Sequence, residues 1–82
     1  MNHLPDCYPL NHLPAQVAQL GVLVSGNGGQ WVPYVVEIES GRFVAALCPI
    51  TPDFQPVGFV PIWATAAAAM YQAYQLATIA AA

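Results

Sequence analysis

The residues best suited to bind a metal ion lie near the N-terminus, where His3, Cys7 and His12 follow one another. Zinc binds imidazole nitrogen and thiolate sulfur, and a structural zinc site usually has four such ligands. The fourth ligand here would have to be Asp6 or Cys48. Because the spacing is loose, we interpret both histidines as surface residues and Cys7 as a small apolar side chain. We therefore expect no metal and no other cofactor, and a small metal-binding domain remains an alternative.

The cysteines Cys7 and Cys48 could act as nucleophiles if His3 or His12 served as a base. Thiolate activation requires a base and an orienting group within a cleft. A chain of 82 residues has little material from which to build one. The N-terminus also lacks the basic region and apolar run of a secretory signal peptide. We therefore expect two reduced thiols, a cytoplasmic location, no small-molecule substrate and no enzymatic activity.

Two carboxylates, Glu37 and Glu39, lie two residues apart and would share one face of a strand. Such a pair resembles the acid and base of a glycoside hydrolase. Arg42 follows a Ser-Gly turn and would lie opposite Glu39, so an exposed ion pair is the simpler interpretation. Ion pairs of this kind contribute about 0–1 kcal/mol. We predict that these residues have a structural role.

The glycine-rich run Ser25–Gly29 reads Ser-Gly-Asn-Gly-Gly. A phosphate-binding loop needs a following helix whose N-terminus faces the anion. Here a strand pattern follows, and the chain has no lysine. Asn-Gly is instead typical of tight hairpin turns, because both residues tolerate positive φ. The run therefore predicts a turn.

The chain is poor in charge. Only 6% of its residues are ionic, against about 25% in an average soluble domain. With a net charge of −3 and one arginine, it cannot supply the phosphate contacts that nucleic-acid binding needs. Large uncovered apolar patches usually mark binding sites, so we predict a protein partner or a homo-oligomer. The five charged residues are Asp6, Glu37, Glu39, Arg42 and Asp53.

Residues 54–82 carry no charge, which raises the question of a membrane span. Pro56 and Pro61 interrupt the start of this segment, and Gln72 and Gln75 lie in its middle. Alanine is barely apolar enough to insert, and no basic flank sets an orientation. We therefore expect no membrane association.

The pattern along the chain predicts an α+β fold, in which one C-terminal helix packs across a small antiparallel β-sheet of two to three strands. Trp31–Glu39 and Arg42–Cys48 alternate as the strands of a hairpin do. Thr65 can cap a helix over Ala66–Ala80, a segment of high helix propensity. Pro49–Pro61 contains four prolines and is expected to be a connection.

The N-terminal part is divided into a proline-rich arm over residues 1–14 and the start of a single domain over residues 15–82. Pro14 could begin a short helix over Ala15–Leu20 that Gly21 ends. Leu20–Val24 is apolar and β-branched, so it could instead be the third strand.

The alternation of the hairpin assigns its two faces. The face expected to meet the helix consists of Val32, Tyr34, Val36 and Ile38. The opposite face is expected to carry Trp31, Pro33, Val35, Glu37 and Glu39. On the helix, the stripe expected to cover the sheet consists of Met70, Ala73, Tyr74 and Ala77, whereas Leu76 and Ile79 lie off it and are expected to be exposed. The predicted partner-binding residues are Trp31, Val35, Glu37, Glu39 and Val44.

These features favour a non-enzymatic protein-binding accessory protein. Small compact chains without catalytic motifs are typical of phages and mobile elements, which suggests an inhibitor of a host defence protein. A structural homo-oligomer, such as a virion or assembly component, is the alternative in which the uncharged surface is covered by further copies of the chain.

Overall fold

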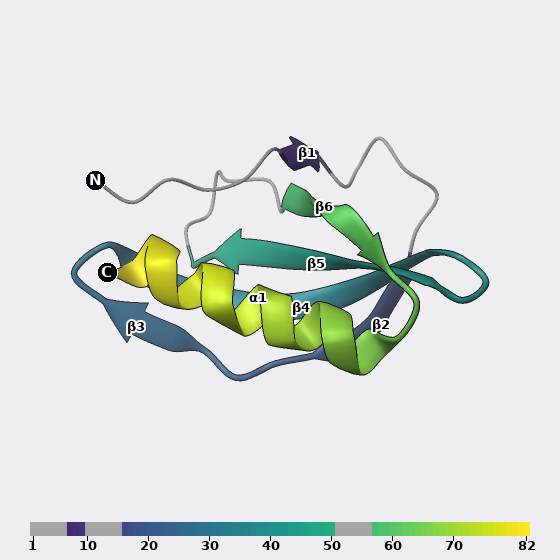
Figure 1. Ribbon diagram of the computed structural model, residues 1–82. Helices are drawn as coiled ribbons and strands as arrows, with labels where there is room; N and C mark the ends of the chain where they lie inside the picture. The colour runs from purple at the N-terminus through teal and green to yellow at the C-terminus, as the bar shows by residue number, and fades with distance from the viewer. Residues whose placement is uncertain (1–6, 10–15, 51–56) are drawn as a thin grey trace.

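The computed structural model describes residues 7–9, 16–50 and 57–82, which form six strands and one helix (Figure 1). Every strand pairing is antiparallel. The strand order is β1-β6-β5-β4-β2, and β3 pairs with the beginning of β4. The helix α1 lies across one face of the sheet (Figure 1). The bounds are β1 Cys7–Pro9, β2 Gln16–Leu20, β3 Val24–Gly26, β4 Gly29–Glu39, β5 Arg42–Pro49, β6 Val57–Trp63 and α1 Ala66–Ala81.

The predicted α+β architecture is confirmed, but the sheet has six strands rather than two to three. The predicted helix over Ala15–Leu20 is wrong, because Gln16–Leu20 forms β2 and pairs with β4. Pairing with a long strand overrides the weak local helix preference of such a segment. Leu20 ends β2, and Val24 begins β3. Within the predicted arm, residues 7–9 form β1, and the rest of the arm lies outside the described residues.

The predicted connection Pro49–Pro61 contains most of β6, which is a second departure from expectation. Ala45 of β5 pairs with Phe59, and the neighbouring Val44 pairs with Ile62, so two residues of β6 bulge out of the ladder. Pro61 is one of them. Proline has no N–H to donate and is tolerated at a bulge, which is how a proline-containing segment can form a strand here.

The predicted C-terminal helix is confirmed: α1 spans Ala66–Ala81, and the predicted range was Ala66–Ala80. The Oγ1 atom of Thr65 accepts a hydrogen bond from the Ala68 N–H at 3.2 Å, so the N-cap is formed as expected. Leu76 is buried and Ile79 is partly buried, so the prediction that both are exposed is wrong. Among the described residues, no helix is long and apolar enough to cross a membrane. The buried helix residues are Ala69, Met70, Ala73, Leu76, Ala77 and Ala81.

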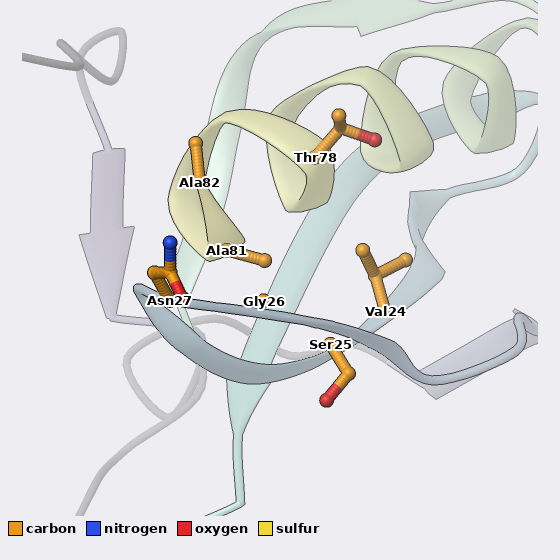
Figure 2. Close-up of a pocket in the computed structure, with 7 residues that line it drawn as sticks. All are labelled: Val24, Ser25, Gly26, Asn27, Thr78, Ala81 and Ala82. Atoms are coloured by element: carbon orange, nitrogen blue, oxygen red, sulfur yellow. The ribbon is translucent and has the colours of Figure 1, made fainter.

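The glycine-rich turn between β3 and β4 receives the C-terminal end of α1 (Figure 2). The Gly28 N–H donates a hydrogen bond to the Ala81 carbonyl oxygen at 2.8 Å. A Cβ atom added at Gly26 would collide with the Ala81 carbonyl, and one added at Gly28 would collide with the Ala80 carbonyl. Glycine is therefore required here by the close approach of helix and turn, in addition to any requirement of the turn itself.

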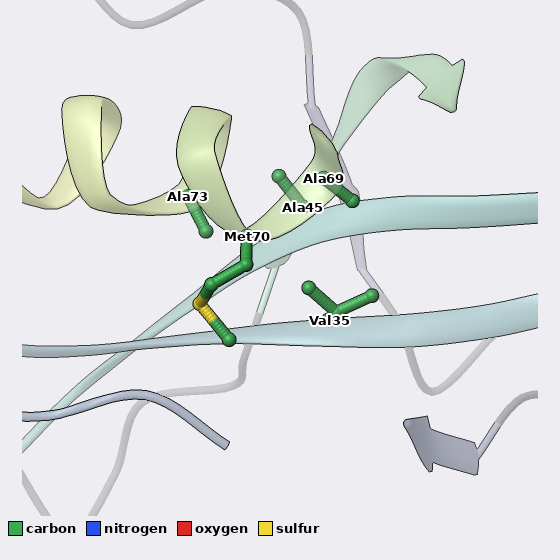
Figure 3. Packing of buried hydrophobic residues seen from close by; sticks show 5 residues of the cluster. All are labelled: Val35, Ala45, Ala69, Met70 and Ala73. Carbon is green, nitrogen blue, oxygen red and sulfur yellow. The ribbon is translucent and has the colours of Figure 1, made fainter. Parts of the chain in front are cut away.

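The core beneath α1 is built from small side chains. Figure 3 shows Met70 and Ala73 reaching from the helix toward Val35 and Ala45 of the sheet. Alanine on both surfaces lets the backbones approach closely and still pack without voids. Farther along the helix, Phe59 and Leu47 fill the space beneath its C-terminal half.

The predicted orientation of the hairpin is therefore wrong. The helix covers the face that carries Trp31 and Val35. The face expected to meet the helix forms a separate cluster, in which Tyr34, Val36 and Ala46 are buried. Alternation could not decide between the faces, because both carry apolar residues that become buried.

A β-bulge at the end of the hairpin adds to this error. Glu39 pairs with Arg42 as predicted, but Glu37 pairs with Phe43, so Ile38 is an extra residue on β4. One extra residue shifts every later pair by one position and exchanges the faces of the partner strand. As a result Val35 lies opposite Ala45, and Val36 lies opposite Val44.

Candidate protein-interaction surface

The five predicted contact residues do not come together on one surface. Val35 is fully buried beneath the helix, and Val44 is fully buried on the opposite face of the sheet. Trp31 is partly buried against the helix side, where its Nε1 donates to the Gly28 carbonyl at 3.3 Å. Glu37 and Glu39 lie at the β4–β5 turn. The structure therefore does not bring Trp31, Val35 and Val44 together on an outer face. The helix α1 covers the face with Trp31 and Val35, and the bulge places Val44 on the other face.

The ionic side chains that the structure describes all lie at the β4–β5 turn. Arg42 Nη1 lies 3.3 Å from Glu39 Oε2, and both side chains are more than half exposed. Glu37 Oε2 accepts a hydrogen bond from the Gly41 N–H at 3.1 Å. Each carboxylate thus has a partner within the turn, as expected for a structural role. The rest of the described surface is uncharged.

The candidate metal ligands can be followed only in part. His3, Asp6 and His12 lie outside the described residues. Cys48 is a free thiol and is partly buried. In the described ranges, no three His, Cys, Asp or Glu side chains are close enough to hold a metal ion.

Exposed apolar side chains gather instead along β2 and the segment that follows it. Of the seven large apolar side chains exposed in the described part of the chain, four lie within residues 17–23. The exposed fractions are 58% for Val17, 71% for Leu20, 73% for Val22 and 44% for Leu23. Four such side chains within seven residues are more concentrated than the scattered single exposures that are normal for a soluble surface.

A bulge in β2 places two of these side chains over one groove. Val17 pairs with Val36, and Leu20 pairs with Tyr34, with the register shifting between Val17 and Gln19. Directly paired residues project to the same face, so Val17 and Leu20 both lie on the face opposite α1. Together they line a shallow groove of about 290 Å³. Its lining residues are Val17, Leu20, Val32, Tyr34 and Cys48.

Backbone contacts hold the segment after β2 in place. The Gly21 N–H donates to the Pro33 carbonyl at 2.8 Å, and the Val22 N–H donates to the Tyr74 hydroxyl at 2.6 Å. These bonds fix the chain while Val22 and Leu23 remain exposed. A surface presented on a fixed backbone loses less conformational entropy on binding than a free loop does.

The outer side of β2 is an edge of the sheet. Within the described residues, β2 pairs with β4 and with no other strand. Natural edge strands are usually protected by charged side chains, by proline or by a covering element. β2 has the sequence Gln-Val-Ala-Gln-Leu, and residues 16–36 contain no charged side chain. In the part of the chain that the structure describes, this edge therefore has neither charge nor proline to oppose pairing with another strand.

No Asp, Glu, Lys or Arg side chain of the described residues lines the groove. Burial raises the pKa of Tyr34 from 10.0 to about 12, with a smaller coulombic contribution from the nearby Cys48. At neutral pH the phenol is therefore uncharged, and the groove favours contact with apolar groups.

Tyr34 also gives a testable pH dependence. Because its pKa is higher in the folded state than in the unfolded chain, the folded protein holds a proton that the unfolded chain has lost. The resulting stability is fully present below pH 10.0 and is lost as the pH rises toward about 12. We expect urea unfolding midpoints to fall over this range, and Tyr34→Phe to remove that part of the alkaline loss. An ultraviolet titration in which the Tyr34 phenol ionises near pH 10.0 would contradict this prediction.

A second hollow, of about 390 Å³, lies between the β3–β4 turn and the end of α1 (Figure 2). No charged side chain lines it, and the Thr78 hydroxyl already donates to the Tyr74 carbonyl at 2.9 Å. We interpret this hollow as the margin of the helix–turn junction.

Comparison of the chain with protein-family models, with curated proteins and with solved structures finds no match. Sequence reasoning missed β2 as part of this surface, although Val17 and Leu20 each directly follow a glutamine in Gln16–Leu20. This alternation of polar and apolar residues was a usable strand signal.

Proposed function

We propose that this chain is a non-enzymatic protein-binding domain and that its partner pairs with β2. The observation that carries the proposal is an edge strand without charge or proline beside an apolar groove. Addition of a strand to a sheet edge is a common mode of peptide recognition, in which main-chain hydrogen bonds give affinity and side-chain pockets give specificity. Here the edge of β2 can supply the main-chain hydrogen bonds, and the adjacent groove can supply the side-chain pocket.

The chemistry of the groove indicates the kind of segment that fits. Val17 and Leu20 form one wall, and Val32 and Tyr34 belong to the neighbouring strand. An extended segment paired with β2 projects alternate side chains toward this face. An aliphatic side chain at such a position would be desolvated against apolar walls, whereas a charged one would lose hydration without gaining an ionic partner. The preferred partner is therefore an extended, uncharged, aliphatic segment.

The proposal is tested by selecting peptides from a random library on the immobilised protein. We expect the selected peptides to be depleted of charge, to contain an aliphatic residue and to perturb the backbone amide resonances of β2 on binding. Leu20→Glu introduces a charge at a largely exposed position and is expected to abolish this binding. Gln75→Glu adds the same charge to the outer side of α1 and serves as the matched control.

Two results would overturn the proposal. One is selection of charged peptides that bind away from β2. The other is equal peptide binding by the Leu20→Glu and Gln75→Glu variants, which would remove β2 and its groove from the interface.

A further inference from the structure

We infer that the strand added to β2 is the β2 strand of a second copy, arranged antiparallel about a two-fold axis. The inference rests on the proposed function and names the partner of the same surface. A two-fold interface places the same patch on both subunits, so the patch must be complementary to itself. An uncharged edge meets this requirement, because no side chain on it repels its own counterpart.

The positions of the exposed aliphatic residues define the register of this pairing. Paired residues in an antiparallel ladder project to the same face. The β2 bulge places both Val17 and Leu20 on the groove face. If Val17 pairs with the partner's Leu20, then Leu20 pairs with the partner's Val17, and both aliphatic pairs lie on that face. The axis then passes between Ala18 and Gln19.

This register also joins the two grooves. Each groove begins at Val17 and Leu20 and continues across β4 to Cys48. Pairing two such edges places the grooves next to each other across the axis, as one apolar surface in a continuous sheet. The partly covered side chains of one subunit thereby gain apolar neighbours from the other.

The charges favour the antiparallel arrangement over the parallel one. Glu37 pairs with Gln16, so the acidic turn lies at the beginning of β2. In the proposed register Gln16 lies opposite the partner's Gly21, and the two acidic turns fall at opposite ends of the interface. Five residues of strand separate them by about 17 Å along the strand, which exceeds the Debye length of about 8 Å at physiological salt. Parallel pairing would bring the two turns to the same end.

The size of the surface indicates a modest affinity. A stable interface of standard size covers about 800 Å² on each partner, which is about one sixth of the 4909 Å² surface of this chain. β2 has five residues, with Val22 and Leu23 exposed beyond its end. An edge of this length corresponds to the low end of interface sizes, so the dimer is expected to dissociate on dilution.

The test is the mass of the purified chain measured by analytical ultracentrifugation, from low micromolar to near-millimolar concentration. We expect a concentration-dependent rise from 8.7 kDa toward twice that value. In Leu20→Glu the new charges are buried beside apolar residues of the partner, and we expect the dissociation constant to rise about 100-fold or more. Gln75→Glu is expected to leave it unchanged. Val17→Glu is a second variant at the same interface, and amide spectra confirm that each variant is folded.

The register is tested in mixed dimers of isotope-labelled and unlabelled chains. We expect intermolecular nuclear Overhauser effects between the methyl groups of Val17 and those of the partner's Leu20. A mass of 8.7 kDa at every concentration overturns the inference, as does a dimer whose stability Leu20→Glu leaves unchanged. If the chain remains a monomer while selected peptides still bind β2, the second copy is excluded and the proposed function stands. If the chain neither dimerises nor binds peptides at β2, the inferred dimer and the proposed function are both wrong.

Discussion

Replacing Phe59 by alanine is expected to destabilise the fold by about 3–5 kcal/mol. The phenyl ring is fully buried and packs with Leu47, Leu76 and Ala77 beneath the C-terminal half of α1. Its removal takes away apolar contact and leaves a cavity, because neighbouring alanines have no atoms with which to fill the space. A domain of this length has a total stability of about 4–12 kcal/mol. The variant should therefore lose a large share of that stability, measured as a lower urea midpoint.

Tyr71→Ala is the matched control for this prediction. It also removes an aromatic ring, but the Tyr71 side chain is exposed on the helix surface. Its effect is expected to lie within about 0.5 kcal/mol. Equal destabilisation by the two substitutions would mean that Phe59 is not packed as the structure describes.

Replacing Gly28 by alanine is the second large effect, with an expected loss of about 1–3 kcal/mol. The added methyl group would collide with carbonyl groups of Ala80 and Ala82. These are backbone atoms and cannot rotate away as a side chain can, so the end of α1 must move. The movement breaks the hydrogen bond from the Gly28 N–H to the Ala81 carbonyl. Amide hydrogen exchange should accelerate in the last turn of the helix before it does elsewhere.

Gly41→Asn separates this steric effect from a general intolerance of glycine turns. Gly41 has φ of 76°, but a Cβ atom there would meet no other atom within 4 Å. Asparagine tolerates this left-handed conformation better than most residues, so the substitution should be mild and leave the helix end protected. If Gly41→Asn is as damaging as Gly28→Ala, the helix–turn contact is not the cause.

The predictable part of the fold is the part whose local signals agree. The helix α1 has a capping Thr65 and a long run of alanine, and it was predicted to within one residue. The hairpin of β4 and β5 was marked by alternation around Ser40-Gly41. In both segments, propensity and pattern favour the same structure.

The remaining strands depend on partners that are distant in the sequence. β1 pairs with β6 through Cys7 and Phe59, and no local pattern in residues 7–9 indicates this contact. β6 contains Pro61, a residue that is disfavoured in strands, and the bulge in β6 is what allows it there. Such strands form because the folded protein offers a neighbouring strand with which to pair, and the local sequence does not show this partner.

The candidate site shows the same division. The scarcity of charged residues is a matter of composition and can be read from the sequence alone. The predicted residues Trp31, Val35 and Val44 do not form one outer patch, because α1 covers the face with Trp31 and Val35 and the extra residue Ile38 places Val44 on the other face. A single bulge cannot be recognised from alternation that is apolar on both faces. Val17 and Leu20 were missed because the sequence left their segment open between a short helix over Ala15–Leu20 and a strand over Leu20–Val24.

The junction between Gly28 and Ala81 has a consequence for biosynthesis. The side of the sheet that contains Val35 and Phe59 acquires its cover when α1 docks, and α1 is the last element to leave the ribosome among those described. Until α1 docks, this apolar side is exposed and offers molecular chaperones a binding site that the folded domain lacks.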